Sequence, residues 1–337
     1  MRAALAGLLE GVPPKQTARA VERLIASYRG RTPTDAPVLR DRTDVAAYAA
    51  YRMPATFQAV SAALGALADR LPHWSPATHL DVGGGTGAAV WAAAATWGDG
   101  TRGDGGRAPR RTTVLDWAEP ALALGRELAG RAGSAALRAA EWQRGRIGGG
   151  TEDLPGADLV TVSYVLGELT EPDRHRAVDA AAAAGRAVVV VEPGTPEGYL
   201  RVREARDRLT AAGLRVLAPC PHSAVCPITP GSDWCHFAAR VSRSSLHRQV
   251  KGGSLAHEDE KFAYVAAVRP GAGGTAAGAR IVRRPQIRKG QVLLELCTGP
   301  DGGGGLRRET VTKRHGPAYR AARDAAWGDT WTPPPAR

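Results

Sequence analysis

The sequence predicts an α/β protein built around a doubly wound, mostly parallel β-sheet. From residue 78 onward, short apolar runs alternate with helical stretches, as in THLDV, TTVLDW, ADLVTVSYV and RAVVVVEP. Such runs, separated by helices, are typical of βαβ units whose strands lie parallel and are buried on both faces. A glycine-rich turn, DVGGGTG, follows the first run and precedes a helical stretch. This order places the turn at the carboxyl edge of the sheet, where α/β folds bind their ligands.

Helices are expected ahead of the sheet, over residues 14–30 and 54–71. The second has a proline in its first turn and an apolar stripe at helical spacing. The stripe consists of Phe57, Val60, Leu64, Leu67 and Leu71. With 337 residues the chain is long enough for more than one compact domain. We assign residues 1–74 to an N-terminal helical region and residues 75–270 to the α/β domain, which LRVLAP and KFAYVAAV are expected to close as a hairpin.

The glycine turn has the D-x-G-x-G-x-G form of class I S-adenosylmethionine-dependent methyltransferases, which share a Rossmann-like sheet. Its residues are Asp81, Gly83, Gly85 and Gly87. Glycines allow positive φ and a close approach of the backbone to a ligand. The next strand ends at Asp116, where a carboxylate can accept hydrogen bonds from ribose hydroxyls. Two alternatives stay open: a structural turn in a chain with 41 glycines, and a dinucleotide-binding domain of the same architecture.

The chemistry of a methyl acceptor is less defined. Amino-methylating enzymes of this fold have an Asn/Asp-Pro-Pro-aromatic tetrapeptide after the fourth strand, where this chain reads SYVLGEL. Asp158, Ser163 and Glu168 fall near the expected acceptor, but Asp158 can equally cap a strand and Glu168 can be a solvated surface residue. Cys220 follows a proline, as a nucleophile for cytosine C5 would. Its two close cysteine neighbours favour a metal-ligand role instead.

The chain has only four cysteines, Cys220, Cys226, Cys235 and Cys297, and three of them fall within sixteen residues. The spacing C-x5-C-x8-C fits neither the close pairs of structural zinc sites nor ferredoxin-type runs. Four thiolates suit either a zinc ion or a 4Fe-4S cluster, with His222 and His236 as possible substitutes, and four unliganded cysteines are the remaining alternative. A Cys-rich insertion over residues 219–260 would need such an organiser because it lacks a core.

The C-terminal segment, residues 271–337, is predicted to be a small β module with a final helix, and an OB-like barrel is one candidate. The net charge of +12 is concentrated late in the chain. From residue 240 onward there are 18 Lys and Arg against 8 Asp and Glu, compared with 27 against 25 before it. Such a segment predicts a polyanion partner, with RNA or DNA as the first candidate, and the alternative is that arginine is simply abundant in this chain. The candidate phosphate contacts are Arg280, Arg283, Arg284, Arg288, Lys289, Arg307, Arg308, Lys313 and Arg314.

Four segments resemble the Rsm22 family of methyltransferase-like small-ribosomal-subunit proteins: VEPGTPEGYLRVREAR, APCPHSAVCPITPGSDWCHF, HEDEKFAYV and AYRAARDAAWGD. The resemblance extends over residues 44–328. It implies a class I methyltransferase fold, binding to small-subunit ribosomal RNA or a pre-ribosomal particle, and a 4Fe-4S cluster. By position, it implies Cys220, Cys226, Cys235 and Cys297 as cluster ligands.

Three functions are therefore weighed. The first is an S-adenosylmethionine-dependent rRNA methyltransferase, and the second is a non-catalytic assembly factor that binds rRNA through the same fold. The third, a DNA-binding iron-sulfur sensor, lacks a recognizable recognition helix. The N-terminal sequence is a poor secretory signal and no apolar run is long enough for a membrane span, so a cytoplasmic protein without a membrane partner is expected. The sequence does not specify an oligomeric state, and a monomer is the simplest expectation.

Overall fold

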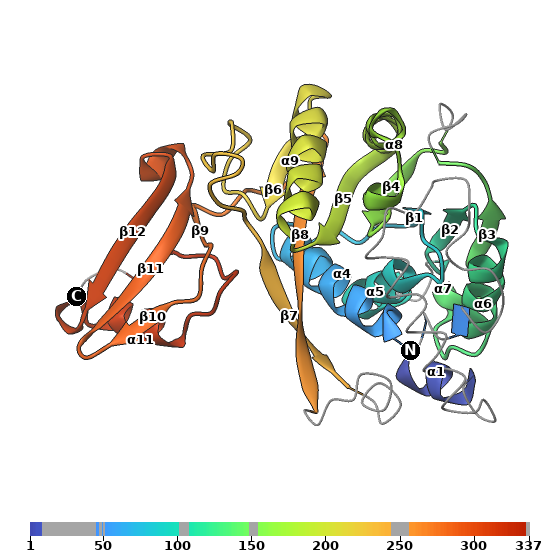
Figure 1. Ribbon diagram of the computed structural model, residues 1–337, viewed down its shortest axis with the longest axis horizontal. Coiled ribbons are helices and arrows are strands. Elements are labelled where there is room, and N and C mark those ends of the chain that lie inside the picture. The colour runs from blue at the N-terminus through green and yellow to red at the C-terminus, as the bar shows by residue number, and fades with distance from the viewer. Residues whose placement is uncertain are drawn as a thin grey trace.

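The computed structural model describes residues 1–8, 45–46, 49, 51–100, 108–147, 154–243 and 256–334. These residues form an α/β domain and a separate C-terminal β module beside it (Figure 1). The helix expected over residues 14–30 lies outside the described residues. Within these ranges, no helix combines the length and the apolar character needed to cross a bilayer.

The α/β domain contains one mixed sheet of eight strands. They are β1 Thr78–Val82, β2 Arg111–Asp116, β3 Glu141–Arg144, β4 Ala157–Ser163, β5 Gly185–Pro193, β6 Arg215–Ala218, β7 Phe237–Ser242 and β8 His257–Val268. The strand order is β3-β2-β1-β4-β5-β8-β6, with β7 paired to β8. Strands β1 to β5 are parallel, and β8 runs antiparallel to β5, β6 and β7. The doubly wound methyltransferase-like fold is thus confirmed.

Helices cover both faces of this sheet (Figure 1). They are α1 Arg2–Leu8, α4 Met53–Ala68, α5 Ala88–Trp97, α6 Glu119–Gly130, α7 Ala135–Arg138, α8 Glu171–Ala184 and α9 Pro196–Ala211. Successive side chains of β5 point to opposite faces of the sheet and pack against both helical layers. Val188 and Val190 pack with α8 and α9, whereas Val189 and Val191 pack with α4. A valine-rich run therefore suits a strand buried on both sides.

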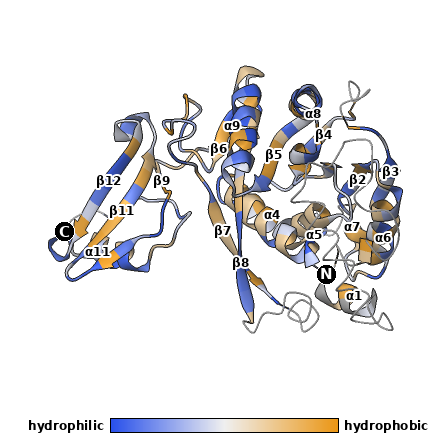
Figure 2. Ribbon diagram, in the orientation of Figure 1, coloured by the Kyte–Doolittle hydropathy of each residue, from blue (hydrophilic) through white to orange (hydrophobic). Residues whose placement is uncertain are grey.

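The predicted closing hairpin is present, since β6 and β8 are antiparallel neighbours. The segment between them is organised differently from the expectation for residues 219–260. Residues 237–242 form β7, an edge strand whose side chains alternate between buried and exposed. The first half of β8, HEDEK, is hydrophilic where it pairs with β7 (Figure 2). The Cys-bearing segment is therefore only residues 219–236.

The C-terminal module is a four-stranded antiparallel sheet covered by one helix. Its elements are β9 Ala279–Ile281, β10 Gln286–Arg288, β11 Gln291–Thr298, β12 Gly305–Thr312 and α11 Pro317–Asp324. Strand β11 is central and pairs with the other three. One face of β11 packs against α11 through Val292, Leu294 and Leu296. The pairing of the described strands leaves the sheet open, so the OB-like barrel considered above is not formed.

The short 3-10 turns are η2 Leu166–Glu168, η3 Pro300–Gly302 and η4 Lys313–His315.

The module contacts the main domain through its last residues as well as through β9. The ring of Trp327 lies 4.8 Å from that of His236 and 6.5 Å from that of Phe237, between centroids. The chain direction after α11 is therefore fixed by an aromatic contact with the segment that precedes β7.

Candidate functional site

The three glycines of the D-x-G-x-G-x-G turn all have positive φ, but their surroundings differ. A Cβ at Gly83 would come within 2.5 Å of Val165, and one at Gly87 within 2.5 Å of Trp142. Both positions are therefore closed by the protein's own packing. A Cβ at Gly85 would meet only Asp116, at 3.8 Å. Gly85 is thus the glycine whose missing side chain leaves space for a ligand beside the backbone.

Asp116 ends β2 directly beside this glycine. Its Oδ2 accepts a hydrogen bond from the Gly85 amide at 2.9 Å, and its Oδ1 accepts one from the Ala118 amide at 2.9 Å. Burial raises its pKa, and these amides oppose the shift. Each carboxylate oxygen can accept a second hydrogen bond. Asp116 can therefore hold the turn in place and still accept hydrogen bonds from ligand hydroxyls.

Asp81 lies beneath the turn in a buried polar network. Thr161 donates to Asp81 Oδ1 at 2.7 Å, and His79 Nε2 lies 2.8 Å from Thr161 Oγ1. Since the threonine hydroxyl donates to the carboxylate, His79 must donate through Nε2–H. Burial lowers the pKa of His79 to about 3, and burial together with the charge of Asp116 raises that of Asp81 to about 7. Asp81 Oδ2 has no hydrogen-bond partner. Asp81 supports the turn from below.

The stretch after β4 is occupied by internal contacts. Tyr164 has φ of 57°, and its hydroxyl donates to Glu260 Oε1 at 3.0 Å. Arg52 donates to both oxygens of the same carboxylate, at 3.2 and 3.0 Å, and lies over the Tyr164 ring. The Leu166 amide donates to Glu192 Oε1 at 3.1 Å. The region where amino-methylating enzymes bind their acceptor is thus held by the protein itself.

The other residues considered near the acceptor differ from one another. Asp158 Oδ2 accepts from the amides of Ala77 and Thr78, at 2.9 and 3.1 Å, so it caps the start of β1. Ser163 is buried at the end of β4. Glu168 is exposed in the 3-10 turn that follows β4, which agrees with the alternative of a surface residue.

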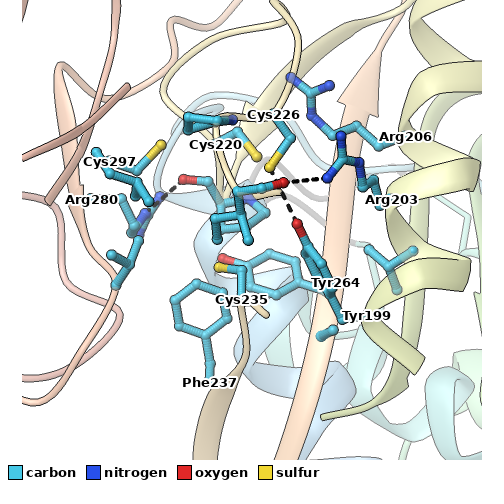
Figure 3. Close-up of a pocket in the computed structure, with 17 residues that line it drawn as sticks. Tyr199, Arg203, Arg206, Cys220, Cys226, Cys235, Phe237, Tyr264, Arg280 and Cys297 are labelled. Atoms are coloured by element: carbon cyan, nitrogen blue, oxygen red, sulfur yellow. Dashed lines mark hydrogen bonds between the residues drawn. The ribbon is translucent and has the colours of Figure 1, made fainter. Parts of the chain in front are cut away.

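All four cysteines line one pocket between the α/β domain and the C-terminal module (Figure 3). Cys220 follows β6, Cys226 lies in the loop after it, and Cys235 precedes β7. Cys297 comes from β11, on the face opposite the module core, because side chains alternate along a strand. The structure thus brings together residues that lie 62 positions apart in the sequence.

The thiol sulfurs are not packed as tightly as a single metal ion would require. Among the described residues, the one group of potential ligands with donor atoms all within 4.8 Å is Glu171, His175 and Glu204 on the surface. No three of the cysteine sulfurs, all of which are described, meet that limit. Tetrahedral zinc with Zn–S bonds of about 2.3 Å would place its sulfurs about 3.8 Å apart. A polynuclear cluster, whose cysteines bind different iron atoms, suits the wider spacing.

The environment of the cysteines is mostly apolar. Burial raises the pKa of Cys220 and that of Cys235, and it raises the pKa of Cys297 to about 12. The Tyr199 hydroxyl lies 3.4 Å from Cys226 Sγ. Buried thiols of this kind are neutral until a metal displaces their protons. They are poorly suited to act as a nucleophile.

The two histidines near the cysteines have different surroundings. His222 is buried, with Nε2 3.6 Å from Cys297 Sγ and Nδ1 3.2 Å from the Ala224 carbonyl. His236 is stacked on Trp234, at 5.3 Å between ring centroids, and contacts the ring of Trp327. His222 therefore lies beside a cysteine thiol, whereas His236 belongs to the contact with the module.

Three arginines line the same pocket, Arg203 and Arg206 from α9 and Arg280 from β9, and Arg203 is only half-buried. Arg280 was expected to meet phosphate, but it is only 5% exposed. The reason is its register: it lies opposite Cys297 in the β9–β11 pair, so both side chains are on the same face of the sheet. It donates to the Pro219 carbonyl at 2.9 Å and the Gly328 carbonyl at 2.7 Å.

The other predicted phosphate contacts lie on the module. Seven of them are exposed: Arg284, Arg288, Lys289, Arg307, Arg308, Lys313 and Arg314. Arg308 is paired with Glu295 at 2.8 Å across the sheet, and Arg307 with Glu309 at 3.0 Å. Arg283 is half-buried and donates to Asp233 and to the Trp234 carbonyl, so it links the module to the Cys-bearing segment.

Sequence reasoning missed several residues of these sites. Arg206 gave no signal, because an arginine on a helix is ordinarily solvated. Glu260 and Arg52 are 208 positions apart and form their ion pair only in the folded chain. Gly84 could have been included, since a Cβ there would lie 2.5 Å from the Asp81 carboxylate. Its signal is its place within an unbroken run of three glycines.

Solved structures match this chain only with low TM-scores and low sequence identity. A precorrin-6y C5,15-methyltransferase of Geobacter metallireducens matches with a TM-score of 0.39 and 13% identity, over 62% of this chain and 87% of that structure. Magnesium protoporphyrin IX methyltransferase of Synechocystis with bound SAH matches with a TM-score of 0.39 and 11% identity, over 64% and 84%. The fold assignment rests on the strand order given above.

Sequence relatives are closer. The human protein "Ribosome assembly protein METTL17, mitochondrial" is 29% identical over 309 residues, which make up 84% of this chain but 61% of that protein. "Rsm22-cox11 tandem protein 2, mitochondrial" of Schizosaccharomyces pombe is 26% identical over 188 residues, 43% of this chain and 24% of that protein. These relatives are mitochondrial proteins, which contradicts the prediction of a cytoplasmic location.

The family model described as "Mitochondrial small ribosomal subunit Rsm22" matches residues 42–332. This range includes the glycine turn, the Cys-bearing segment and nearly all of the module. Because the match extends over most of the sequence, the chain belongs to the Rsm22 family.

Proposed function

We propose that this protein is an assembly factor of the small ribosomal subunit, which binds ribosomal RNA through its C-terminal module. The observation that carries the proposal is the meeting of four cysteines from two separate parts of the chain in one pocket. A group bound there would fix the basic surface of the module relative to the methyltransferase-like domain. The human relative, a ribosome assembly protein, supports the same role.

The bound group is proposed to be a structural 4Fe-4S cluster held by Cys220, Cys226, Cys235 and Cys297. No three of the sulfurs lie within 4.8 Å of one another, which favours the cluster over zinc, the alternative. Such a cluster supplies a rigid, covalently ligated link between the Cys-bearing loop and the module. An anaerobic absorbance spectrum separates the two possibilities, since a zinc protein is colourless.

The RNA contact is assigned to the exposed cations of the module. Arg284, Arg288, Lys289, Lys313 and Arg314 are exposed and surround the open edge and turns of the sheet. Lysine and arginine side chains bind phosphate oxygens with strongly salt-dependent affinity and little base preference. The partner is therefore proposed to be small-subunit rRNA within a pre-ribosomal particle, recognised together with its proteins.

S-adenosylmethionine is proposed as the ligand of the glycine turn. The open position at Gly85 and the carboxylate of Asp116 fit a nucleoside with a ribose. When bound, S-adenosylmethionine supplies an electrophilic methyl group. In this chain Gly83 and Gly87 shape the turn, Asp81 supports it, and Asp116 orients the ribose. Titration calorimetry tests the proposal, and the absence of binding heat would remove S-adenosylmethionine from it.

Methyl transfer to rRNA is the first of two candidate activities, and the second is RNA binding without catalysis. The contacts of Tyr164 favour the second, because its hydroxyl is bound to Glu260 rather than presented to an acceptor. Crosslinking of the protein to rRNA, with methylation mapping in a deletion strain, separates them. A crosslinked site without a lost methyl group indicates binding alone. A methyl group lost at the crosslinked site indicates an enzyme, and no crosslink to small-subunit rRNA would refute both.

A further inference from the structure

The cysteine pocket contains two buried positive charges that the thiols alone do not explain. Arg206 is 4% exposed and Arg280 is 5% exposed. Figure 3 shows Arg280 with Cys297 on one side of the pocket and Arg206 near Cys226 on the other. They come from the two parts that the pocket separates, Arg206 from α9 of the main domain and Arg280 from β9 of the module. Burying a guanidinium is costly unless an anion compensates for it.

The protein itself supplies little compensation. Arg206 pairs with Asp207 at 3.1 Å, but that carboxylate is 56% exposed and therefore largely screened. Arg280 binds only backbone carbonyls, and among the described residues it forms no ion pair. Each guanidinium also keeps a buried N–H without an acceptor, at Nε of Arg206 and Nη2 of Arg280. Buried donors without acceptors are rare enough to need a reason.

A thiolate-ligated metal group would supply that reason. Four thiolates outweigh the charge of the metal and inorganic sulfide they enclose, so the group is a net anion. Its sulfur atoms can also accept the unpaired N–H groups. We propose that Arg206 and Arg280 are positioning residues that neutralise the thiolate-bound group and donate hydrogen bonds to its sulfurs, one from each side of the domain–module interface. This inference rests on the proposed occupancy of the four cysteines.

The proposal has a physical consequence for the bound group. One-electron reduction of an iron-sulfur cluster adds negative charge, so a nearby cation stabilises the reduced form. Removal of either cation should lower the midpoint potential and loosen the group. Removal of Arg280 should also weaken the contact between the two parts, because it donates to the Pro219 carbonyl at 2.9 Å. Arg206 Nη2 donates to the His222 carbonyl at 3.0 Å, which lies within the main domain, so its removal should loosen the Cys-bearing segment instead.

The test compares Arg206→Gln, Arg280→Gln and Arg280→Lys with wild type and with Arg110→Gln. Arg110 is the matched control, because it is 2% exposed and binds the Pro76 carbonyl at 3.2 Å, but lies outside the pocket. Iron and sulfide content, midpoint potential during a dithionite titration followed by electron paramagnetic resonance, and iron loss to a chelator are measured on the full chain. Thermal unfolding identifies any variant that fails to fold.

Each Gln variant is expected to shift the one-electron equilibrium about tenfold toward the oxidised form, a fall of about 59 mV. Chelators should remove its iron about tenfold faster, and Arg280→Lys should restore part of both effects. If Arg280→Gln does not fold, Arg206→Gln and Arg280→Lys decide the question by the same readouts.

Gln variants that match Arg110→Gln in potential and in metal loss would overturn the inference while leaving the cluster in place. Wild-type protein without iron or sulfide would instead refute the proposed cluster. If the wild-type protein holds zinc instead, the rate of zinc loss to a chelator is measured for the same variants and compared with that of Arg110→Gln. Without any metal at the cysteines, the inference fails together with the proposed function.

Discussion

The second and third glycines of the D-x-G-x-G-x-G turn, Gly85 and Gly87, allow a direct test of which glycine serves the fold and which serves a ligand. Gly85→Ala and Gly87→Ala both place a side chain at positive φ, 52° and 81°, which costs about 1–2 kcal/mol. Only the Gly87 variant also forces a methyl group to within 2.5 Å of the Trp142 ring. Overpacking of this kind adds about 1–3 kcal/mol. We therefore expect losses of about 1–2 kcal/mol for Gly85→Ala and about 2–5 kcal/mol for Gly87→Ala.

Urea unfolding at constant m-value measures these losses, and calorimetry with S-adenosylmethionine measures affinity. Gly85→Ala should stay folded and lose affinity, because its methyl group occupies the space left for the ligand. Trp142→Leu should recover part of the loss in the Gly87→Ala background, and a double-mutant cycle isolates that coupling. Equal destabilisation of the two single variants, or an unchanged affinity in Gly85→Ala, would refute the division of roles.

Three further outcomes are expected. The pKa of Asp81 is about 7 in the folded state and 3.8 in the unfolded state, so the folded state holds this proton more tightly and the free energy of unfolding should fall as pH rises from 4 to 7. Asp81→Asn should remove that fall. Parallel pH profiles of the unfolding free energy for wild type and Asp81→Asn would contradict the prediction. Replacing Lys313 and Arg314 by Glu should weaken RNA binding and reduce its salt slope by about one per lost phosphate contact, whereas Arg240→Glu, on β7 outside the module, should change neither. Cys297→Ser should speed cleavage of residues 270–278 by a nonspecific protease, and unchanged cleavage would show that Cys297 does not hold the module.

Much of the fold could be predicted because its signals are local. The valine run of β5 and the turn between β1 and α5 each specify their own conformation. The helix predicted over residues 54–71 is present as α4, with Leu64 and Leu67 fully buried. Strand β7, FAARVS, was missed because it was assigned to the Cys-rich insertion. Its buried and exposed side chains alternate as in an edge strand, but its pairing with β8 depends on the folded chain.

The cysteine pocket could be predicted only in part. Scarcity and clustering identify the four cysteines as a set, but spacing along the chain does not say whether Cys297 meets the other three. That depends on the register of β11, which places Val292, Leu294 and Leu296 in the module core and Cys297 on the other face. The same rule explains the error at Arg280, because its register opposite Cys297 turns its side chain into the pocket instead of toward solvent.

The central claim is that the four cysteines bind one group that joins the module to the α/β domain. It is tested most directly by iron and acid-labile sulfide analysis of anaerobically purified wild type and Cys297→Ser. The account predicts about four iron and four sulfide per wild-type chain, and loss of most of both in the variant, although three cysteines remain in the other segment. A colourless wild-type protein with one zinc ion would contradict the cluster, and full iron content in Cys297→Ser would contradict the link between the two parts.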